Sequence, residues 1–376
     1  MDEKKFLVGK FREYYRNNKL VYTERLNQRE IGFIPFDGKM IRHMNAENQQ
    51  QLQLLISDFN PRHLYHSVAY YKYPDKRSMQ EKQWTGAEYV FDLDADHIPG
   101  ADKMPYEQIL QDVKIHTMRL INKFLLGYLE IDPGSLSLFF SGARGYHVHI
   151  KNDAFYQMNS DQRREISNLA RGEGISAKSF ISIVSKNSIS GKGWIRDIDE
   201  KVKDAIRKID AGERTEYLDI PAEMKVKALL DKRVSAKDRR PYVQLFNDNN
   251  TEIYNHANAP VIGEVLEKII AAYLKNNAIE IDEPVSTDIH RLIRFPYSLH
   301  GKTGLMVKKI ELDELKDFEP LNDAIPGSFG TDQVHARMKQ PFEITFKGER
   351  YSLDGEVMVP TDLGIFLSLS GRANIY

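Results

Sequence analysis

Residues 136–150 have the sequence LSLFFSGARGYHVHI, which predicts two apolar β-strands joined by a glycine-containing loop. A loop of this kind lets backbone N–H groups approach an anion. Arg144 can donate two parallel hydrogen bonds to a phosphate, and Ser141 and His147 can add further contacts. The stretch favours a phosphate-binding loop at the end of a sheet, although an ordinary turn with an exposed arginine also fits these residues.

Another strand is predicted upstream at residues 87–94, because apolar and acidic positions alternate there. A strand places Asp92 and Asp94 on one face, close to each other. Two carboxylates that close repel unless a cation lies between them, and hard divalent cations prefer carboxylate oxygens. The pattern favours a metal site, but two solvated acids at a strand end would have the same spacing.

A third group of candidate residues follows a predicted strand at residues 279–282. Asp282 lies on the strand face opposite Ile279 and Ile281, which makes it a candidate third metal ligand. We therefore expect its carboxylate to converge with those of the upstream acid pair.

Basic residues are dense in the segment that comes next. A short helix is predicted at residues 288–294, with Arg291 and Arg294 on one face, and His300 and Lys302 follow it. Four potential cations mixed with glycine suit a triphosphate or template phosphates. A surface helix with solvated basic residues is the alternative.

The order of these elements predicts a mixed α/β fold. A helix is predicted at residues 3–16, and a strand and hairpin follow at 29–38. Helices are also predicted at 109–124 and near 261–274. Residues 161–240 are charged and poor in strand signals, so we expect a helical insertion there, within a core formed by 1–160 and 241–376.

Composition excludes several classes of protein. The net charge of −1 excludes a uniformly basic nucleic-acid coat, so any polyanion site must be local. The chain has no cysteine, which excludes disulfides and cysteine-ligated zinc. No apolar run approaches the roughly 18 residues that a membrane helix needs, and the first residues do not resemble a signal peptide. We expect a soluble, cytoplasmic protein without a membrane partner.

Taken together, the three motifs resemble those of one known family. Residues 91–94, 141–147 and 291–305 are similar, in order and separation, to the signature motifs of the small catalytic subunit of archaeal and eukaryotic DNA primases. The archaeal members are the more similar. Residues 29–33 resemble an N-terminal motif of this family, and residues 359–371 resemble its C-terminal segment. The resemblance covers most of the chain outside the expected insertion.

The resemblance implies a primase-type catalytic core and a role for each matching residue. Asp92, Asp94 and Asp282 match the three metal-binding carboxylates, with Mg²⁺ or Mn²⁺ as the expected ion. The matching nucleotide-binding residues are Ser141, Arg144, His147, Arg294 and His300. Glu30, Arg291 and Lys302 are further neighbours of the same site. The implied activity is primer synthesis on single-stranded DNA from nucleoside triphosphates, with the primase large subunit as partner.

One departure from the family is clear. Many members carry a zinc-binding cluster of cysteines and histidine between the acid pair and the glycine loop. Residues 95–140 contain no cysteine here, only His97 and His116, so we expect no structural zinc.

Two alternative functions stay open. A repair or end-joining polymerase of the same superfamily would share the acid pair and the phosphate loop. An inactive nucleic-acid-binding subunit is disfavoured, because a pure binder has no use for clustered carboxylates beside DNA.

Overall fold

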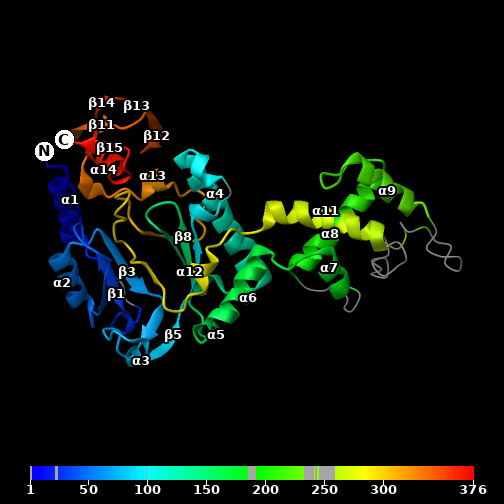
Figure 1. Cartoon of the computed structure of the whole chain (residues 1–376), viewed down its shortest axis with the longest axis horizontal. Helices are drawn as coiled ribbons and strands as arrows, with labels where there is room; N and C mark the ends of the chain where they lie inside the picture. The colour runs from blue at the N-terminus through cyan, green and yellow to red at the C-terminus, as the bar shows by residue number, and fades with distance from the viewer. Residues whose placement is uncertain are drawn as a thin grey trace. The chain divides into compact units, whose positions relative to one another are not determined.

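The computed structural model describes residues 2–21, 24–98, 100–184, 192–232 and 259–376, together with positions 241 and 244. The chain divides into two compact units (Figure 1). Unit 1 consists of Met1–Met118, Ile131–Ser167 and Glu280–Tyr376, and unit 2 consists of Arg119–Glu130 and Asn168–Ile279.

Helices and strands are mixed throughout unit 1, which confirms the predicted fold class. Its helices include α1 (Glu3–Asn17), α2 (Gln49–Phe59), α3 (Met79–Lys82), α4 (Tyr106–Met118), α5 (Asp153–Tyr156), α12 (Glu283–Thr287), α13 (Pro320–Asp323) and α14 (Thr361–Leu369). Helix α6 (Ser160–Arg171) begins in this unit. Among the helices that the structure describes, none is both long and apolar enough to cross a membrane.

The first sheet of unit 1 has the strand order β2-β1-β3-β9, with all neighbours antiparallel. Its strands are β1 (Ile31–Ile34), β2 (Ile41–Met44), β3 (His63–Ser67) and β9 (Leu292–Arg294). Helix α2 packs on this sheet, where the rings of Phe33 and Phe59 lie 4.3 Å apart. Helix α1 buries Leu7, Phe11 and Tyr14, which recur at helical spacing, as predicted.

The second sheet has the order β10-β7-β8-β6 and is also antiparallel. Its strands are β6 (Tyr89–Leu93), β7 (Leu136–Phe140), β8 (Tyr146–Ile150) and β10 (Lys308–Ile310). Strands β7 and β8 are buried along their whole length, which explains their nearly continuous apolar sequence. The two strands predicted around the glycine loop and the acid strand are therefore confirmed.

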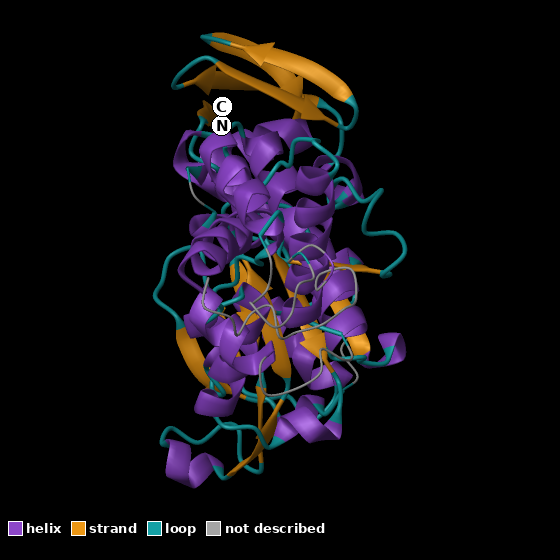
Figure 2. Cartoon of the chain, turned by 90° about the vertical axis from the view of Figure 1, so that its right-hand side faces the viewer, coloured by secondary structure: helices purple, strands orange, loops and turns teal. Residues whose placement is uncertain are grey.

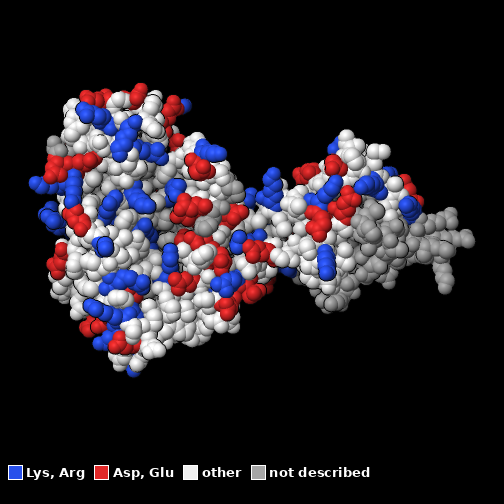
Figure 3. Space-filling view, in the orientation of Figure 1, with Lys and Arg blue, Asp and Glu red and all other residues white. Residues whose placement is uncertain are grey.

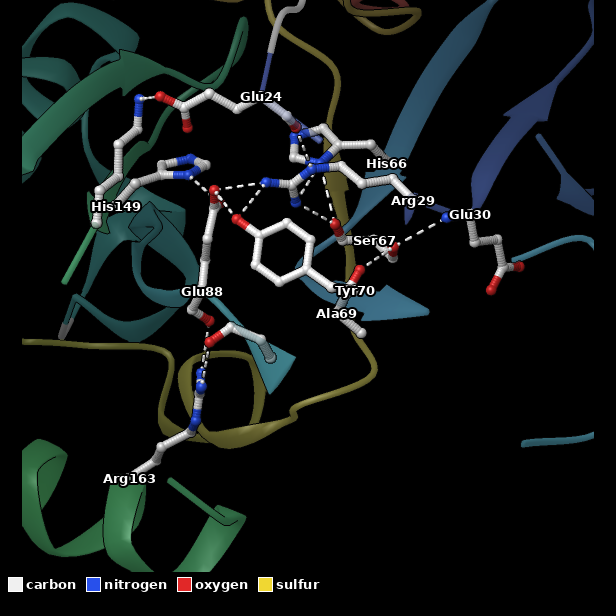
Figure 4. A network of polar contacts seen from close by, with 12 residues as sticks. Glu24, Arg29, Glu30, His66, Ser67, Ala69, Tyr70, Glu88, His149 and Arg163 are labelled. Atoms are coloured by element: carbon white, nitrogen blue, oxygen red, sulfur yellow. Dashed lines mark hydrogen bonds and ion pairs between the residues drawn. The ribbon is translucent and has the colours of Figure 1, made fainter. Parts of the chain in front are cut away.

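A buried polar network links the two sheets (Figure 4). Its centre is Glu88, which lies between β5 (Trp84–Ala87) and β6. One Glu88 oxygen accepts hydrogen bonds from Arg29, just before β1, at 2.5 Å and from the Tyr70 hydroxyl at 2.9 Å. The other oxygen lies 3.0 Å from Nδ1 of His149, on β8. A single carboxylate thus contacts side chains attached to both sheets.

The C-terminal part of unit 1 adds smaller sheets. One has the order β14-β11-β15, and the hairpin β12-β13 is separate from it; a further hairpin, β4-β5, belongs to the N-terminal part of the unit. The strands are β4 (Ala69–Tyr71), β11 (Gln333–Met338), β12 (Phe342–Phe346), β13 (Glu349–Leu353), β14 (Glu356–Pro360) and β15 (Ala373–Ile375). Figure 2 shows the two chain ends close together beside these C-terminal strands, and Glu3 accepts hydrogen bonds there from Ser368 and the Ile375 N–H.

Unit 2 is helical in its described residues. It contains a π-helix (Arg119–Tyr128), α7 (Ala177–Val184), α8 (Trp194–Asp210), α9 (Ile220–Leu230) and α11 (Ala259–Asn277). Asp197 of α8 joins three of these elements: it pairs with Lys123 at 3.2 Å and accepts hydrogen bonds from Tyr128 and Tyr273.

The limits of unit 2 differ from those of the insertion expected at residues 161–240. Ile262, Leu266 and Ile269 of α11 are buried in one apolar cluster with α7, α8 and α9. Residues 259–279, which we had expected in the core, therefore belong to unit 2. Part of the expected insertion, at 185–191 and 233–240, lies outside the described residues.

Two predicted elements are wrong. Residues 279–282 do not form a strand: Ile279 and Ile281 are buried alternately, but the only backbone bond to a described strand is from Asp282 N–H to the Asp92 carbonyl. Residues 288–294 do not form a helix, since 292–294 pair with β3 and the short helix α12 comes earlier. Pro284 in the first turn of α12 suits that earlier start.

Lys, Arg, Asp and Glu side chains are intermingled on the face of unit 1 shown in Figure 3. This distribution agrees with the balanced net charge. Any site for a polyanion must therefore come from a few residues brought together by the fold.

Candidate active site

The acid pair lies at the end of β6. Phe91 and Leu93 are buried, while Asp92 and Asp94 are only partly buried and lie on the alternate face, as predicted. Across the ladder, Asp92 is paired with His147 of β8. The strand therefore presents both carboxylates beside the glycine loop that connects β7 and β8.

Burial and mutual repulsion disfavour the ionised forms of these acids. Burial, Asp94 and Asp282 together raise the pKa of Asp92 to about 8. Burial and Asp96 also raise the pKa of Asp94. One oxygen of Asp94, Oδ1, is buried without a hydrogen-bond partner among the described residues. Arg291 and Arg294 near Asp92, and Arg144 near Asp94, oppose these shifts but do not outweigh them, so the two carboxylates are not fully stabilised by the described residues.

Asp282 is brought next to the pair by the backbone. Its N–H donates to the Asp92 carbonyl at 2.8 Å, but its side chain accepts a hydrogen bond from the Val285 N–H and caps α12. Within the described part of the chain, no three His, Asp or Glu side chains are arranged to hold a metal ion. The predicted convergence of all three carboxylates is therefore not seen, because Asp282 is engaged at the helix end.

The glycine loop lies directly against the acid strand. Ser141 closes the loop, because its N–H donates to the Gly145 carbonyl and its hydroxyl accepts from the Gly145 N–H. A Cβ at position 145 would lie 2.4 Å from the Leu93 carbonyl oxygen, so only glycine permits this approach. The same loop contacts a distant segment: a Cβ at Gly142 would lie 2.7 Å from Cβ of His300.

Thr303 strengthens that second contact by donating a hydrogen bond to the Gly142 carbonyl at 2.5 Å. The loops that carry Arg144 and His300 are therefore neighbours, although more than 150 residues separate them in sequence. This is the juxtaposition that a shared triphosphate site requires.

The two arginines of the site differ in environment. Arg144 is partly exposed and pairs with Asp96 at 2.6 Å. Arg294 is partly buried, and none of the described carboxylates lies within ion-pair distance of it. Burial lowers the pKa of Arg294, and the nearby Asp92 and Asp94 oppose that shift. Arg294 is thus a cation in the interior without an acid of its own.

The neighbours of Arg294 are uncharged. Its Nη1 lies 2.5 Å from Nδ1 of His63, and its Nη2 lies 2.9 Å from Nε2 of His300. The guanidinium carbon is 4.6 Å from the centre of the Tyr65 ring. Burial and the charge of Arg294 lower the pKa of His300 well below its usual range.

His147 is the remaining predicted residue. It is buried, its Nε2 lies 3.5 Å from Asp92 Oδ1, and its Nδ1 has no hydrogen-bond partner among the described residues. Burial, the neighbouring His149 and the charge of Arg294 lower the pKa of His147 to about 3. His147 is therefore neutral and available as a hydrogen-bonding group at the edge of the site.

Sequence reasoning missed His63 and Tyr65. The residues around them are rich in tyrosine and valine, which is typical of a strand, but nothing in that pattern distinguishes these two side chains. Their role depends on the pairing of β3 with β9, which places Tyr65 opposite Arg294. Arg291 is exposed and directly precedes β9. Because residues 292–294 form a strand and not a helix, Arg291 and Arg294 do not share a helical face.

A sequence model described as DNA primase small subunit matches residues 91–312, more than half of the chain. The chain belongs to the DNA primase small-subunit family. All eight predicted site residues lie within the matched segment. Membership makes the protein an enzyme of the primase class, a DNA-directed nucleotidyltransferase, as the motifs predicted.

Full-length relatives agree with this family assignment. The chain is 40% identical to DNA primase small subunit PriS of Picrophilus torridus, over 95% of this chain and 94% of the relative. It is 37% identical to PriS of Thermoplasma volcanium (97% and 95% covered) and 33% identical to PriS of Methanothrix thermoacetophila (98% of each). Among solved structures, the polymerase domain of Mycobacterium tuberculosis Ligase D in complex with DNA aligns with a TM-score of 0.35 at 10% identity, covering 84% and 83% of the two chains.

Proposed function

We propose that this chain is the catalytic subunit of a DNA primase that makes short primers on single-stranded DNA by metal-dependent nucleotidyl transfer. One observation carries the proposal: Asp92, Asp94 and Arg294 are close enough to shift one another's pKa, yet in the described residues none of them forms an ion pair with a residue of opposite fixed charge. Asp92 and Asp94 are destabilised as carboxylates, and Arg294 is held by neutral groups. A nucleoside triphosphate with its divalent cations supplies both missing charges at once.

The donor set fits Mg²⁺ or Mn²⁺. Asp92 and Asp94 offer only oxygen ligands, and the free, buried Oδ1 of Asp94 is unused by the protein in the described residues. Asp282 would join them on release from its capping bond. Divalent ions bound there would lower the pKa of the attacking 3′-hydroxyl and stabilise the charge that develops at the α-phosphorus.

The side chains on the other edge of the site would act on the triphosphate. Arg294 would donate to phosphate oxygens from a fixed orientation, and Arg144 would do so after exchanging Asp96 for phosphate. His147 and His300, both neutral, would add hydrogen bonds without altering the charge balance. These contacts would neutralise the leaving pyrophosphate as it separates.

The arginines provide the first test of this assignment. Arg144→Ala and Arg294→Ala should each weaken nucleotide binding by roughly 10- to 150-fold, since each removes a charge-assisted contact worth about 1.5–3 kcal/mol. Arg294 should show the larger loss, because Arg144 must first give up Asp96. Nucleotide and DNA affinities should be measured separately by calorimetry and fluorescence anisotropy, with exposed Arg350→Ala as the control. Loss of DNA binding with normal nucleotide binding in both variants would assign these residues to a template groove.

Metal removal provides the second test. A chelator should stop nucleotide incorporation without lowering the melting temperature, and Mg²⁺ or Mn²⁺ should restore incorporation. Elemental analysis of the purified protein should find no stoichiometric zinc. Tightly held zinc would contradict this expectation and point to a site involving His116 and nearby acids.

The activity itself separates the primase from its rival. We expect template-dependent synthesis from two free nucleotides with no primer present. A repair or end-joining polymerase would extend a supplied primer but would not start a new strand. As a small subunit, the protein is proposed to act with a large subunit, which would assist initiation.

A further inference from the structure

His63 lies beside Arg294 on the adjacent strand of the first sheet. The pairing of β3 with β9 places Tyr65 opposite Arg294, and His63 lies two residues along on the same face. Nη1 of Arg294 donates to Nδ1 of His63 at 2.5 Å, and the Gly301 N–H donates to the same nitrogen at 3.2 Å. One imidazole nitrogen therefore joins the arginine to the loop that carries His300.

These two donors define the tautomer of His63. An arginine N–H and a backbone N–H can only donate, so Nδ1 must be the unprotonated acceptor and the ring proton must lie on Nε2. Burial and the charges of Arg294, Arg62 and Lys302 lower the pKa of His63 to about 3, so the ring stays neutral at working pH. A neutral acceptor restrains the guanidinium and leaves its positive charge in place. A carboxylate would restrain the guanidinium but would also neutralise its charge.

The chain is shaped around this contact. A Cβ at Gly301 would lie 2.4 Å from Cγ of Arg62 and 2.7 Å from Nε2 of His63, so glycine is needed for the loop to approach the strand. Arg62 Nε also donates to the Gly301 carbonyl at 2.8 Å. The loop is thus fixed to the His63 segment by both of the polar groups of one glycine.

We propose that His63 is a positioning residue for nucleotide binding: its Nδ1 orients Arg294 toward the triphosphate and couples that arginine to the His300 loop. The inference rests on the proposed function, because it assigns a role within the same nucleotide site. His63 acts through Arg294 and makes no contact with substrate.

Two substitutions separate this role from packing. His63→Leu keeps much of the volume but removes the acceptor, and it should weaken nucleotide binding roughly tenfold, mainly as a rise in KM. His63→Asn places a carbonyl oxygen near the position of Nδ1 and should stay within about threefold of the wild type. If His63→Leu does not fold, His63→Gln takes its place, since its longer side chain carries the acceptor away from Nδ1.

Two further measurements test the route through Arg294. In an Arg294→Ala background, His63→Leu should have no additional effect on nucleotide affinity. Tyr14→Phe is the matched control: it removes the 2.7 Å hydrogen bond from Tyr14 to the Tyr297 carbonyl in the same segment, without touching Arg294, and should leave nucleotide affinity unchanged. Nitrogen-15 NMR of the wild type should show His63 with an unprotonated Nδ1.

Each outcome is decisive. Unchanged affinity in His63→Leu, equal losses in the Leu and Asn variants, or losses that add to Arg294→Ala would overturn the inference alone. Failure of the wild-type protein to bind any nucleoside triphosphate would overturn the proposed function, and the inference with it.

Discussion

Asp92→Asn or Asp94→Asn should reduce nucleotide incorporation by on the order of 10³-fold or more, because an amide cannot supply the charge that stabilises the transition state through bound cations. The same variants should melt at or above the wild-type temperature. Burial and neighbouring acids raise the pKa of both residues, so the ionised acids destabilise the fold that contains them. Incorporation and thermal unfolding should be measured on the same preparations.

The combination of the two results is what identifies a functional acid. Substitution of an acid with a structural role would lower the melting temperature of the protein. Substitution of a dispensable acid would change neither the melting temperature nor nucleotide incorporation. Asp102→Asn is a suitable control, since Asp102 is an exposed acid in the same unit. Near-wild-type incorporation in either Asp92→Asn or Asp94→Asn would rule out the metal assignment.

Glu88→Ala and Arg29→Ala should each lower the free energy of unfolding by about 3–5 kcal/mol, because each leaves its partner charged and unpaired in the interior. Both side chains are fully buried, and Figure 4 shows the hydrogen bonds around them. Burial opposes ionisation of Glu88, but Arg29, His149 and His66 outweigh it and hold the pKa of Glu88 well below its usual range. The midpoint of urea unfolding measures the loss.

An exposed pair of the same two residue types provides the control. Arg337 and Glu356 lie 2.6 Å apart, with side chains 65% and 58% exposed. Replacing either by Ala should cost less than about 1 kcal/mol, since water screens such pairs. Equal losses at the buried and the exposed pair would contradict the view that the Glu88 network holds the two sheets together.

The structural elements around the candidate site that were predicted correctly depend on local patterns. Alternation of apolar and acidic residues around Asp92 is enough to indicate a strand with both acids on one face. The glycines at 142 and 145 mark a loop between two buried strands, and the structure explains each by a close backbone approach. Patterns of this kind depend on a few neighbouring residues, so sequence alone reveals them.

The errors arise where tertiary pairing decides the outcome. The basic residues at 288–294 suit a helix face as well as a strand, and only the ladder with β3 selects the strand. No local sequence pattern marks His63, because its contact is with Arg294, more than 200 residues away in the sequence. The limit of unit 2 was missed for the same reason, since the apolar face of α11 fits a core helix equally well until its neighbours are known.

The central claim is that this site is completed by a nucleotide together with its divalent cations, and calorimetry can test it directly. Nucleoside triphosphate should be titrated into the wild-type protein with and without Mn²⁺, and into Asp92→Asn under both conditions. We predict that Mn²⁺ tightens nucleotide binding at least roughly tenfold in the wild type, a coupling of about 1.4 kcal/mol, and that Asp92→Asn abolishes the coupling. Equal wild-type affinity with and without the metal would contradict the account.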